Sequence, residues 1–418
     1  MAGAVNRVVD VLVIGAGPAG LAAAARLARA EGGRYRVEVL EREREAGGVP
    51  RHCAHGGFGL ADFGRPLDGP GYARRLTRTA VRSGATLRTG VSATGWSGPL
   101  TLDVTAPTGL ERITARAVLL ATGARERPRS ARLVPGTRPA GVLTTGELQQ
   151  STYLYGVRRE RLGRRAAVIG AEPVAHHAVR VLRGAGVDVV AMVTEQPCGP
   201  RWFGALAPPP LLLGTKVAEL LGRGRLAGIR VRHADGRTGT IRCDTAVFTG
   251  DWIPDHDLAR SGGVPLDSGT RGPAVDGAFR TASAGIFAAG NVLRGVESAG
   301  AAAAEGRGAA DAVLRHLPGA AWPDSAVPLT AQDPVAWVAP NRVVDGAAGR
   351  PFLVRLREPL ARPVVEVAQE GRVLHRARLL GTAWPHRSVR LSAAWVREVD
   401  PAGPPVNVRV DTRAPGRA

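Results

Sequence analysis

The segment Asp10–Glu41 restricts the fold more than any other part of the chain. It opens with an apolar run, Val11–Ile14, of the kind that is buried on both faces in a parallel sheet. Three glycines follow at G-x-G-x-x-G spacing, Gly15, Gly17 and Gly20. The first permits a tight turn, the second lets the backbone approach a diphosphate, and the third lets the next helix pack closely on the strand. The segment therefore predicts a βαβ unit that binds a nucleotide, with Ala16 in its turn.

A second strand, Arg36–Leu40, ends at Glu41. A carboxylate at this point accepts hydrogen bonds from ribose hydroxyls and repels a 2′-phosphate. The apolar stretch Val8–Leu27 is long enough to suggest a membrane span or a signal sequence. Glycines, Pro18 and Arg26 interrupt it, and no basic flank or cleavage pattern surrounds it. We therefore expect no membrane span.

Length and charge limit the remaining possibilities. A chain of 418 residues is expected to hold two or three domains. Its net charge of +20 suggests nucleic acid as a partner, but the positive residues are scattered arginines, and Lys216 is the only lysine. Aromatic residues make up only 4% of the chain and offer little surface on which bases can stack. We therefore expect no nucleic-acid binding, and an anionic substrate or acidic partner fits the charge equally well.

The three cysteines, Cys53, Cys198 and Cys243, are far apart and contain no CxxC pair. They provide neither a disulfide framework nor the ligands of an iron–sulfur cluster. A reduced, cytoplasmic setting is the expectation that follows.

Several short elements follow the first unit. A helix is expected over Tyr72–Ser83 and separate strands over Glu111–Ala115 and Ala117–Ala121. The last strand ends at Thr122 and Gly123, a turn placed to lie against the nucleotide.

A second βαβ pattern begins near Arg164, with a strand at Ala166–Ile169 and a strand at Val187–Val193 that leads to Glu195. The middle glycine of its fingerprint is replaced by Glu172, which would crowd and repel a diphosphate. Two interpretations stay open, a functional NAD(P) site and a domain retained for its structure.

A further strand lies within Thr281–Asn291, and an alanine-rich helix follows over Ser298–Leu317. Beyond a joint rich in proline and glycine, short segments with alternating apolar and polar residues predict a small antiparallel β module. The fold class is thus α/β, with two Rossmann-like βαβ domains and this module. The expected divisions are an FAD-binding domain at 5–128 and 244–317, an NAD(P)-binding-like domain at 129–243, and the C-terminal β module at 325–418.

Taken together, DVLVIGAGPAG with Glu41, LLATGAR, the second βαβ unit and TASAGIFAAGN resemble the flavoproteins with two dinucleotide-binding domains, typified by pyridine nucleotide-disulfide oxidoreductases. GGVPRHCAHGGFGLADFGRPLDGPGYARRL and GVLTTGELQQ look like the flavin subunits of opine, hydroxyproline or proline dehydrogenases and of hydrogen cyanide synthase, and of the FAD-dependent oxidoreductases associated with glycerol 3-phosphate oxidation. The resemblance implies FAD as the cofactor. The residues it assigns to FAD are Gly15, Ala16, Gly17, Gly20, Glu41, Thr122, Gly123, Gly290 and Asn291.

The chain departs from the family at two places. Asn291 stands where the family usually has aspartate, and only Cys53 follows Gly47–Gly48, where disulfide reductases have a CxxxxC pair. Disulfide reduction by a dithiol of this chain is therefore excluded. If electrons leave through an iron–sulfur cluster, a partner must carry it.

Arg51, His52, Cys53 and His55 fall where the family's chain passes beside the isoalloxazine ring. A cation there would bind an acidic substrate or stabilise charge on reduced flavin, and an imidazole would move a proton. The alternative is that these residues only cap turns and pack. A metal site is disfavoured because adjacent side chains diverge and no fourth ligand is evident.

Three hypotheses result. In the first, the chain is an FAD-dependent oxidoreductase whose flavin takes a hydride from a small organic substrate, an amine or amino acid derivative, and passes electrons to a ferredoxin-like or second flavoprotein subunit. In the second, NAD(P)H reduces the flavin, and Glu172 argues against it. In the third, the chain is a non-catalytic subunit that holds flavin for electron transfer.

Overall fold

The computed structural model describes residues 5–197, 208–344 and 350–411. Cys198 lies outside the described residues. The chain forms two compact units, one made of Met1–Arg125 with Ile253–Ala418 and the other of Glu126–Trp252. Unit 2 is therefore inserted into unit 1, and the chain passes between them only at Arg125–Glu126 and Trp252–Ile253.

Unit 1 contains a sheet in the order β3-β2-β1-β6-β5-β4, in which β17 also pairs with β6. Its strands are β1 (Val5–Ile14), β2 (Val37–Glu41), β3 (Thr86–Thr89), β4 (Ser92–Gly98), β5 (Thr101–Ala106), β6 (Gly109–Leu120) and β17 (Ile286–Ala288). The strands β1, β2, β3, β6 and β17 run parallel. Their carboxyl ends therefore meet at one edge, where the glycine turn lies.

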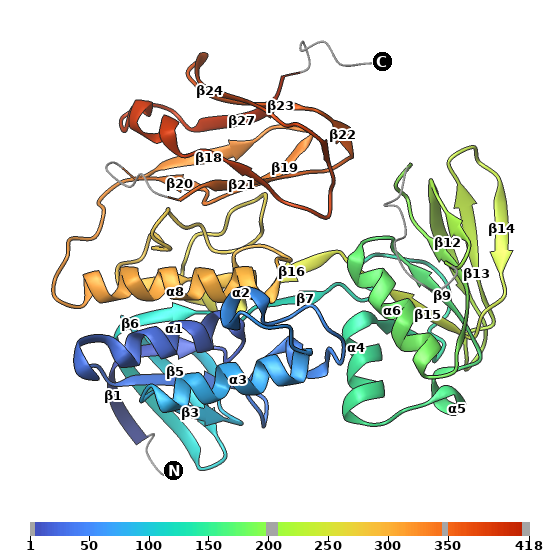
Figure 1. Cartoon of the computed structure of the whole chain (residues 1–418), viewed down its shortest axis with the longest axis horizontal. Coiled ribbons are helices and arrows are strands. Elements are labelled where there is room, and N and C mark those ends of the chain that lie inside the picture. The colour runs from blue at the N-terminus through green and yellow to red at the C-terminus, as the bar shows by residue number, and fades with distance from the viewer. Residues whose placement is uncertain (1–4, 198–207, 345–349, 412–418) are drawn as a thin grey trace. The chain divides into compact units, whose positions relative to one another are not determined.

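Three long helices accompany this sheet, and they are α1 (Pro18–Arg29), α3 (Gly69–Arg82) and α8 (Ala299–His316). Helix α1 packs against both α3 and α8, and the three run side by side in Figure 1. Alanines dominate α1, so neighbouring helices approach it closely. The side chains of Leu12, Leu21 and Phe287 are fully buried in the resulting core.

The structure corrects two expectations and adds one strand. Residues 109–120 form one strand rather than two, because Arg116, which interrupts the apolar pattern, points outward to Asp10 and stays in the strand. Helix α3 begins at Gly69 rather than Tyr72, since the Asp68 carboxylate accepts a hydrogen bond from Gly71 N and caps the helix. Strand β4 was not predicted, because its small and polar residues show no clear alternation.

Unit 2 has a parallel sheet in the order β11-β10-β9-β15-β8 and an antiparallel sheet in the order β12-β13-β14. Its elements are β8 (Val142–Thr144), α4 (Thr145–Gln149), α5 (Arg159–Leu162), β9 (Arg165–Ile169), α6 (Pro173–Gly184), β10 (Asp188–Val193), β11 (Leu211–Leu212), β12 (Thr215–Leu221), β13 (Gly228–His233), β14 (Thr238–Ile241) and β15 (Thr245–Phe248). Val168 packs in one hydrophobic cluster and Ala167 in another, so the parallel sheet is buried on both faces.

The C-terminal part of unit 1 is rich in β-structure. Its larger sheets run β20-β18-β27-β23-β24 and β19-β21-β26. The strands are β18 (Val327–Ala331), β19 (Val335–Ala339), β20 (Arg342–Val343), β21 (Phe352–Leu356), β22 (Leu360–Ala361), β23 (Val364–Gln369), β24 (Arg372–Arg378), β25 (Thr382–Ala383), β26 (Val389–Leu391) and β27 (Val406–Val410). Pairing is antiparallel except between β18 and β27, which run parallel. Side chains from both sheets share one hydrophobic core around Trp395.

Candidate functional site

The glycine turn after β1 has the geometry of a diphosphate cradle. Gly15 has φ +103°, and a Cβ atom there would lie 2.5 Å from Ala121 O, so only glycine fits. A Cβ atom on Gly20 would collide with Gly15 O, whereas one on Gly17 would meet nothing within 4 Å. Helix α1 begins beside Gly17 with no side chain capping it, so its first N–H groups are available to an anion. The open space at Gly17 therefore fits the diphosphate of a dinucleotide.

Glu41 lies at the end of β2, next to this turn. Its carboxylate accepts hydrogen bonds from Ala16 N at 2.9 Å and from Glu43 N at 3.0 Å, one on each oxygen. A carboxylate offers about four acceptor positions, so two remain for the hydroxyls of a ribose. The bonds to backbone hold Glu41 in place before any ligand binds.

The segment after β2 folds back over the glycine turn. Gly47 N donates to Ala16 O at 2.8 Å. A Cβ atom on Gly48 would lie 2.9 Å from Gly17 Cα, so glycine is needed for this approach.

Thr122 and Gly123 follow β6 at the same edge of the sheet. The Thr122 hydroxyl donates to Asp255 O at 2.6 Å, and Asp255 N donates to Gly123 O at 2.8 Å. These bonds tie the turn to the chain that returns after unit 2. The Thr122 hydroxyl is thus used within the protein, while the backbone of the turn borders Gly15.

Gly290 and Asn291 follow β17. Gly290 has φ +80°, and a Cβ atom there would lie 2.7 Å from Ala19 Cβ in the first turn of α1. The Asn291 side chain spans its own loop, because Oδ1 accepts from Glu297 N at 2.9 Å and Nδ2 donates to Glu297 O at 3.3 Å. An aspartate cannot make the second bond, which accounts for asparagine at this position. Gly290 therefore meets α1 at the cradle, and Asn291 shapes the loop behind it.

The four candidates of the Arg51–His55 segment have different surroundings. The Arg51 guanidinium pairs with Glu43 at 2.6 Å and donates to Glu45 O at 3.0 Å. His52 is buried, its Nδ1 has no hydrogen-bond partner within the described chain, and burial lowers its pKa, so the ring is neutral at pH 7. Cys53 Sγ lies 3.4 Å from Val49 O, and His55 Nδ1 lies 2.8 Å from Gly56 O.

Throughout residues 5–197, 208–344 and 350–411, no group of three His, Cys, Asp or Glu side chains is placed to hold a metal ion.

In unit 2 the turn after β9 is filled by a side chain. Glu172 Oε2 accepts a hydrogen bond from Ala171 N at 3.1 Å, and the Thr249 side chain also hydrogen-bonds to the carboxyl group. A Cβ atom on Gly250 would lie 3.0 Å from Glu172 Oε1, so the carboxyl group occupies the space between the two turns. Burial raises the pKa of Glu172, against the opposing effect of these hydrogen bonds and of Arg132.

A second carboxyl group close by was not singled out from the sequence. Glu126 accepts a hydrogen bond from Gly146 N at 2.7 Å. Burial raises the pKa of Glu126 to about 7, and the nearby Glu172 adds to the rise. Arg132 donates to the carbonyl oxygens of Thr249 and Gly250, and its positive charge opposes the rise in the pKa of Glu126. No local motif marks Glu126, because its neighbours come from distant parts of unit 2.

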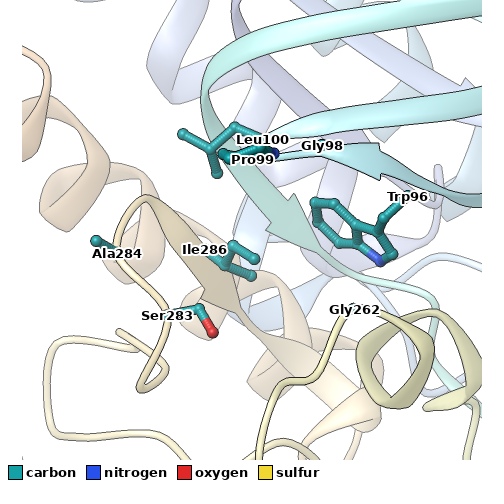
Figure 2. A pocket seen from close by; sticks show the side chains of 8 residues that line it. All are labelled: Trp96, Gly98, Pro99, Leu100, Gly262, Ser283, Ala284 and Ile286. Carbon is teal, nitrogen blue, oxygen red and sulfur yellow. The ribbon is translucent and has the colours of Figure 1, made fainter.

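Figure 2 shows a pocket of about 320 Å³ in unit 1, lined among others by Trp96, Leu100, Ser283 and Ile286. Ser283 precedes β17, whereas Gly290 follows it, so the pocket lies at the opposite end of that strand from the cradle. It is therefore separate from the candidate site.

Within the described ranges of the chain, none of the helices is both long and apolar enough to cross a membrane.

Comparison with known proteins shows the family of the chain. The family "Pyridine nucleotide-disulphide oxidoreductase" matches residues 9–205 and 210–306. The alpha subunit of sarcosine oxidase from Rhizobium meliloti (strain 1021) is 30% identical over 365 residues, which are 82% of this chain and 34% of that protein. An opine oxidase subunit from Agrobacterium tumefaciens (strain Ach5) is 28% identical over 344 residues, 74% of this chain and 66% of that protein. The chain thus spans only about a third of the first relative and just under two thirds of the second.

Two solved structures share the fold. T. acidophilum thioredoxin reductase has a TM-score of 0.60 at 22% identity and covers 73% of this chain and 98% of its own. L-proline dehydrogenase from P. horikoshii has a TM-score of 0.56 at 21% identity and covers 77% of this chain and 58% of its own. These likenesses confirm the predicted α/β architecture. The match to the family, which covers most of the chain, confirms the predicted FAD cofactor and oxidoreductase class: the chain belongs to the pyridine nucleotide-disulphide oxidoreductase family.

Proposed function

We propose that this chain is the flavin-binding subunit of a dehydrogenase or oxidase that takes a hydride from an amine or amino acid derivative and passes the electrons to a partner subunit. The observation that carries the proposal is the 30% identity to the alpha subunit of a sarcosine oxidase over 82% of the chain. The similarity to an opine oxidase subunit points to the same substrate class, because both names denote compounds with an oxidisable C–N bond.

The thiol content supports this choice over the disulfide chemistry of other family members. A single cysteine, Cys53, follows Gly47–Gly48, and its thiol is buried against Val49 O. A dithiol is needed to exchange electrons with a disulfide substrate. The substrate of this chain therefore reacts at the flavin itself.

The protein's part in the reaction is binding, orientation and proton movement. FAD supplies the hydride acceptor when it is bound. Its ADP half would be held by Gly15, Ala16, Gly17, Gly20 and Glu41. Thr122 and Gly123 would pack against the cofactor, and Gly290 with Asn291 would meet its diphosphate and ribityl chain. In the Arg51–His55 segment, the neutral ring of His52 is able to accept a proton, and His55 is a second proton carrier. Arg51 supplies positive charge, and Cys53 lines the turn.

Reduction by NAD(P)H is the competing function, and the filled turn of unit 2 weighs against it. The carboxyl group of Glu172 occupies the place of the diphosphate and takes the Ala171 N–H that would otherwise bind it. Electrons are instead expected to leave through a ferredoxin-like or second flavoprotein subunit. Such a partner is needed for a cluster, because the three cysteines of this chain cannot ligate one.

The test is anaerobic reduction of the purified flavoprotein. Sarcosine, an opine, L-proline, NADH and NADPH are added separately, and loss of the oxidised-flavin absorbance is followed by stopped flow. We expect one of the three amine substrates to bleach the flavin and the nicotinamide cofactors to leave it oxidised. His52→Gln and His55→Gln are then compared with His375→Gln on β24, a control outside the segment. Only the first two are expected to slow bleaching, by about tenfold or more, because general acid–base catalysis contributes on this scale.

Rapid bleaching by NADH or NADPH contradicts the proposal. If no amine substrate bleaches the protein even in the presence of its co-purified partner, the chain is a flavin-holding electron-transfer subunit. A protein that binds no FAD excludes all of these functions.

A further inference from the structure

The C-terminal β module lies beyond the residues matched by the family, and its contacts suggest a role at the flavin site. The loop that follows β17 carries Gly290 and Asn291, and Asn291 closes this loop through its two bonds to Glu297. The positions of Asn291 and Glu297 are therefore linked, so a contact that restrains Glu297 also restrains Asn291.

Gly290 is held from the opposite side by helix α8. Glu305 Oε2 accepts a hydrogen bond from Gly290 N at 3.1 Å, and Glu305 Oε1 accepts one from Arg294 Nη2. Arg294 is only 2% exposed and lies within 4.0 Å of Glu297. A buried ion pair thus connects the backbone of Gly290 with the far end of the loop.

Arg355 of β21 completes this arrangement from the C-terminal β module. Its Nη1 donates to Gly295 O at 3.1 Å, and its Nη2 donates to Val296 O at 3.2 Å and to Glu297 Oε1 at 2.9 Å. Ser388, next to β26, donates to the same carboxylate. One buried guanidinium therefore binds three consecutive residues of the loop.

The charges of this network cancel. Arg294 and Arg355 face Glu297 and Glu305, and both guanidinium groups lie over the ring of Trp337, at 5.8 and 4.8 Å from its centroid. Removing one partner leaves a buried charge uncompensated, which is costlier than losing a surface ion pair.

We propose that the C-terminal β module, acting through Arg355, holds the Gly290–Glu297 loop in the conformation that binds FAD. Arg355 is then a positioning residue, since it acts through Glu297 and Asn291 rather than on the cofactor. The inference rests on the proposed placement of FAD at Gly290 and Asn291.

The experiment compares Arg355→Met with a control, Arg357→Met. Arg357 lies two residues after Arg355 and forms an exposed ion pair with Asp333, which the control substitution removes. FAD affinity is measured on the FAD-free protein by quenching of flavin fluorescence, and amide hydrogen exchange is followed over residues 290–297. For Arg355→Met we expect FAD to bind at least about tenfold more weakly, the equivalent of one charge-assisted hydrogen bond, and loop amides to exchange faster. Arg357→Met is expected to match the wild type in both measurements.

Two further variants keep the test decisive if Arg355→Met fails to fold, which its melting curve would reveal. Arg355→Lys can still reach the Glu297 carboxylate, so its FAD affinity is expected to lie between those of the wild type and Arg355→Met. Ser388→Ala removes the bond to Glu297 and the bond accepted from Arg355 but leaves the ion pair between them, so it is expected to weaken FAD binding by a smaller factor. Unchanged FAD affinity in folded Arg355→Lys and Ser388→Ala would overturn the proposal, as would faster loop exchange with no change in affinity. Failure of the wild type to bind FAD would instead contradict the proposed cofactor site.

Discussion

The carboxyl group of Glu172 lies against Gly170, so that a Cβ atom on this glycine would come 2.7 Å from Glu172 Oε2. The second dinucleotide fold thus carries a carboxyl group of its own at the point where a diphosphate would enter. The carboxyl group already accepts from Ala171 N, a donor that an external ligand in this turn would otherwise use.

Glu172→Gly is therefore expected to open this site. The substitution restores the middle glycine of the fingerprint, frees Ala171 N and empties the space that the carboxyl group fills. Isothermal titration with NADH and with ADP should show binding to the variant and none to the wild type. Glu172→Gln is the control, because it removes the charge but keeps the volume. Equal binding by Glu172→Gln would show that charge alone closes the site, and binding by the wild type would refute the blocked turn.

Glu126→Gln is expected to make stability less dependent on pH. Because the folded pKa is about 7 against an ordinary value of 4.5, the folded state binds more protons than the unfolded state between these values. Stability is therefore lost as pH rises from 4.5 to 7, by no more than about 3 kcal/mol. Urea unfolding at pH 5 and pH 8 should show the variant gaining stability at pH 8. Glu160→Gln on the exposed surface of α5 serves as the control, and an equal gain there would argue against burial as the cause.

Gly17→Ala and Gly20→Ala should separate cofactor binding from folding. A methyl group on Gly17 meets no protein atom within 4 Å, so unfolding of the FAD-free protein should change by about 1 kcal/mol or less. The same methyl group would occupy the diphosphate space and weaken FAD binding at least about tenfold. On Gly20 it would collide with Gly15 O and cost about 3 kcal/mol or more. Normal FAD affinity in Gly17→Ala would place the diphosphate elsewhere.

Glu41→Gln tests the ribose contact. The amide keeps the shape of the side chain, but its NH₂ group would face either Ala16 N–H or Glu43 N–H and could not accept from it. FAD affinity, measured by equilibrium dialysis, should fall about tenfold or more. The control is Glu31→Gln, at an exposed site near the end of α1, which should leave the affinity unchanged. Unchanged affinity in Glu41→Gln would show that FAD does not bind beside this residue.

The parts of the fold that were predicted from sequence depend on neighbours along the chain. The glycine turn, the acid at the end of β2 and the second βαβ unit each have a local pattern, because a sharp turn and a buried parallel strand both restrict residue type. The Glu172 substitution was visible for the same reason. That Glu172 fills the turn itself required the structure, because its rotamer is set by Thr249 and Gly250.

The rest depends on long-range pairs. Glu126 meets Gly146 across twenty residues and Arg355 meets Glu297 across fifty-eight, and neither has a spacing that marks it. A single charged residue also led to a wrong prediction. Arg116 interrupts the apolar pattern of β6, so two strands were predicted, but its side chain points away from the sheet to Asp10 and the strand continues.

Because unit 2 is inserted into unit 1, the two units are completed at different times during synthesis of the chain. Strand β17 pairs with β6 and helix α8 packs on α1, yet 165 residues separate Leu120 from Ile286, including the whole of unit 2. Since domains generally fold as units while the chain emerges from the ribosome, unit 2 is complete while unit 1 still lacks β17, α8 and the C-terminal β module. If Arg355 holds the Gly290–Glu297 loop as proposed, the cradle is finished only after β21 has left the ribosome, and we expect FAD to bind late in the synthesis of the chain.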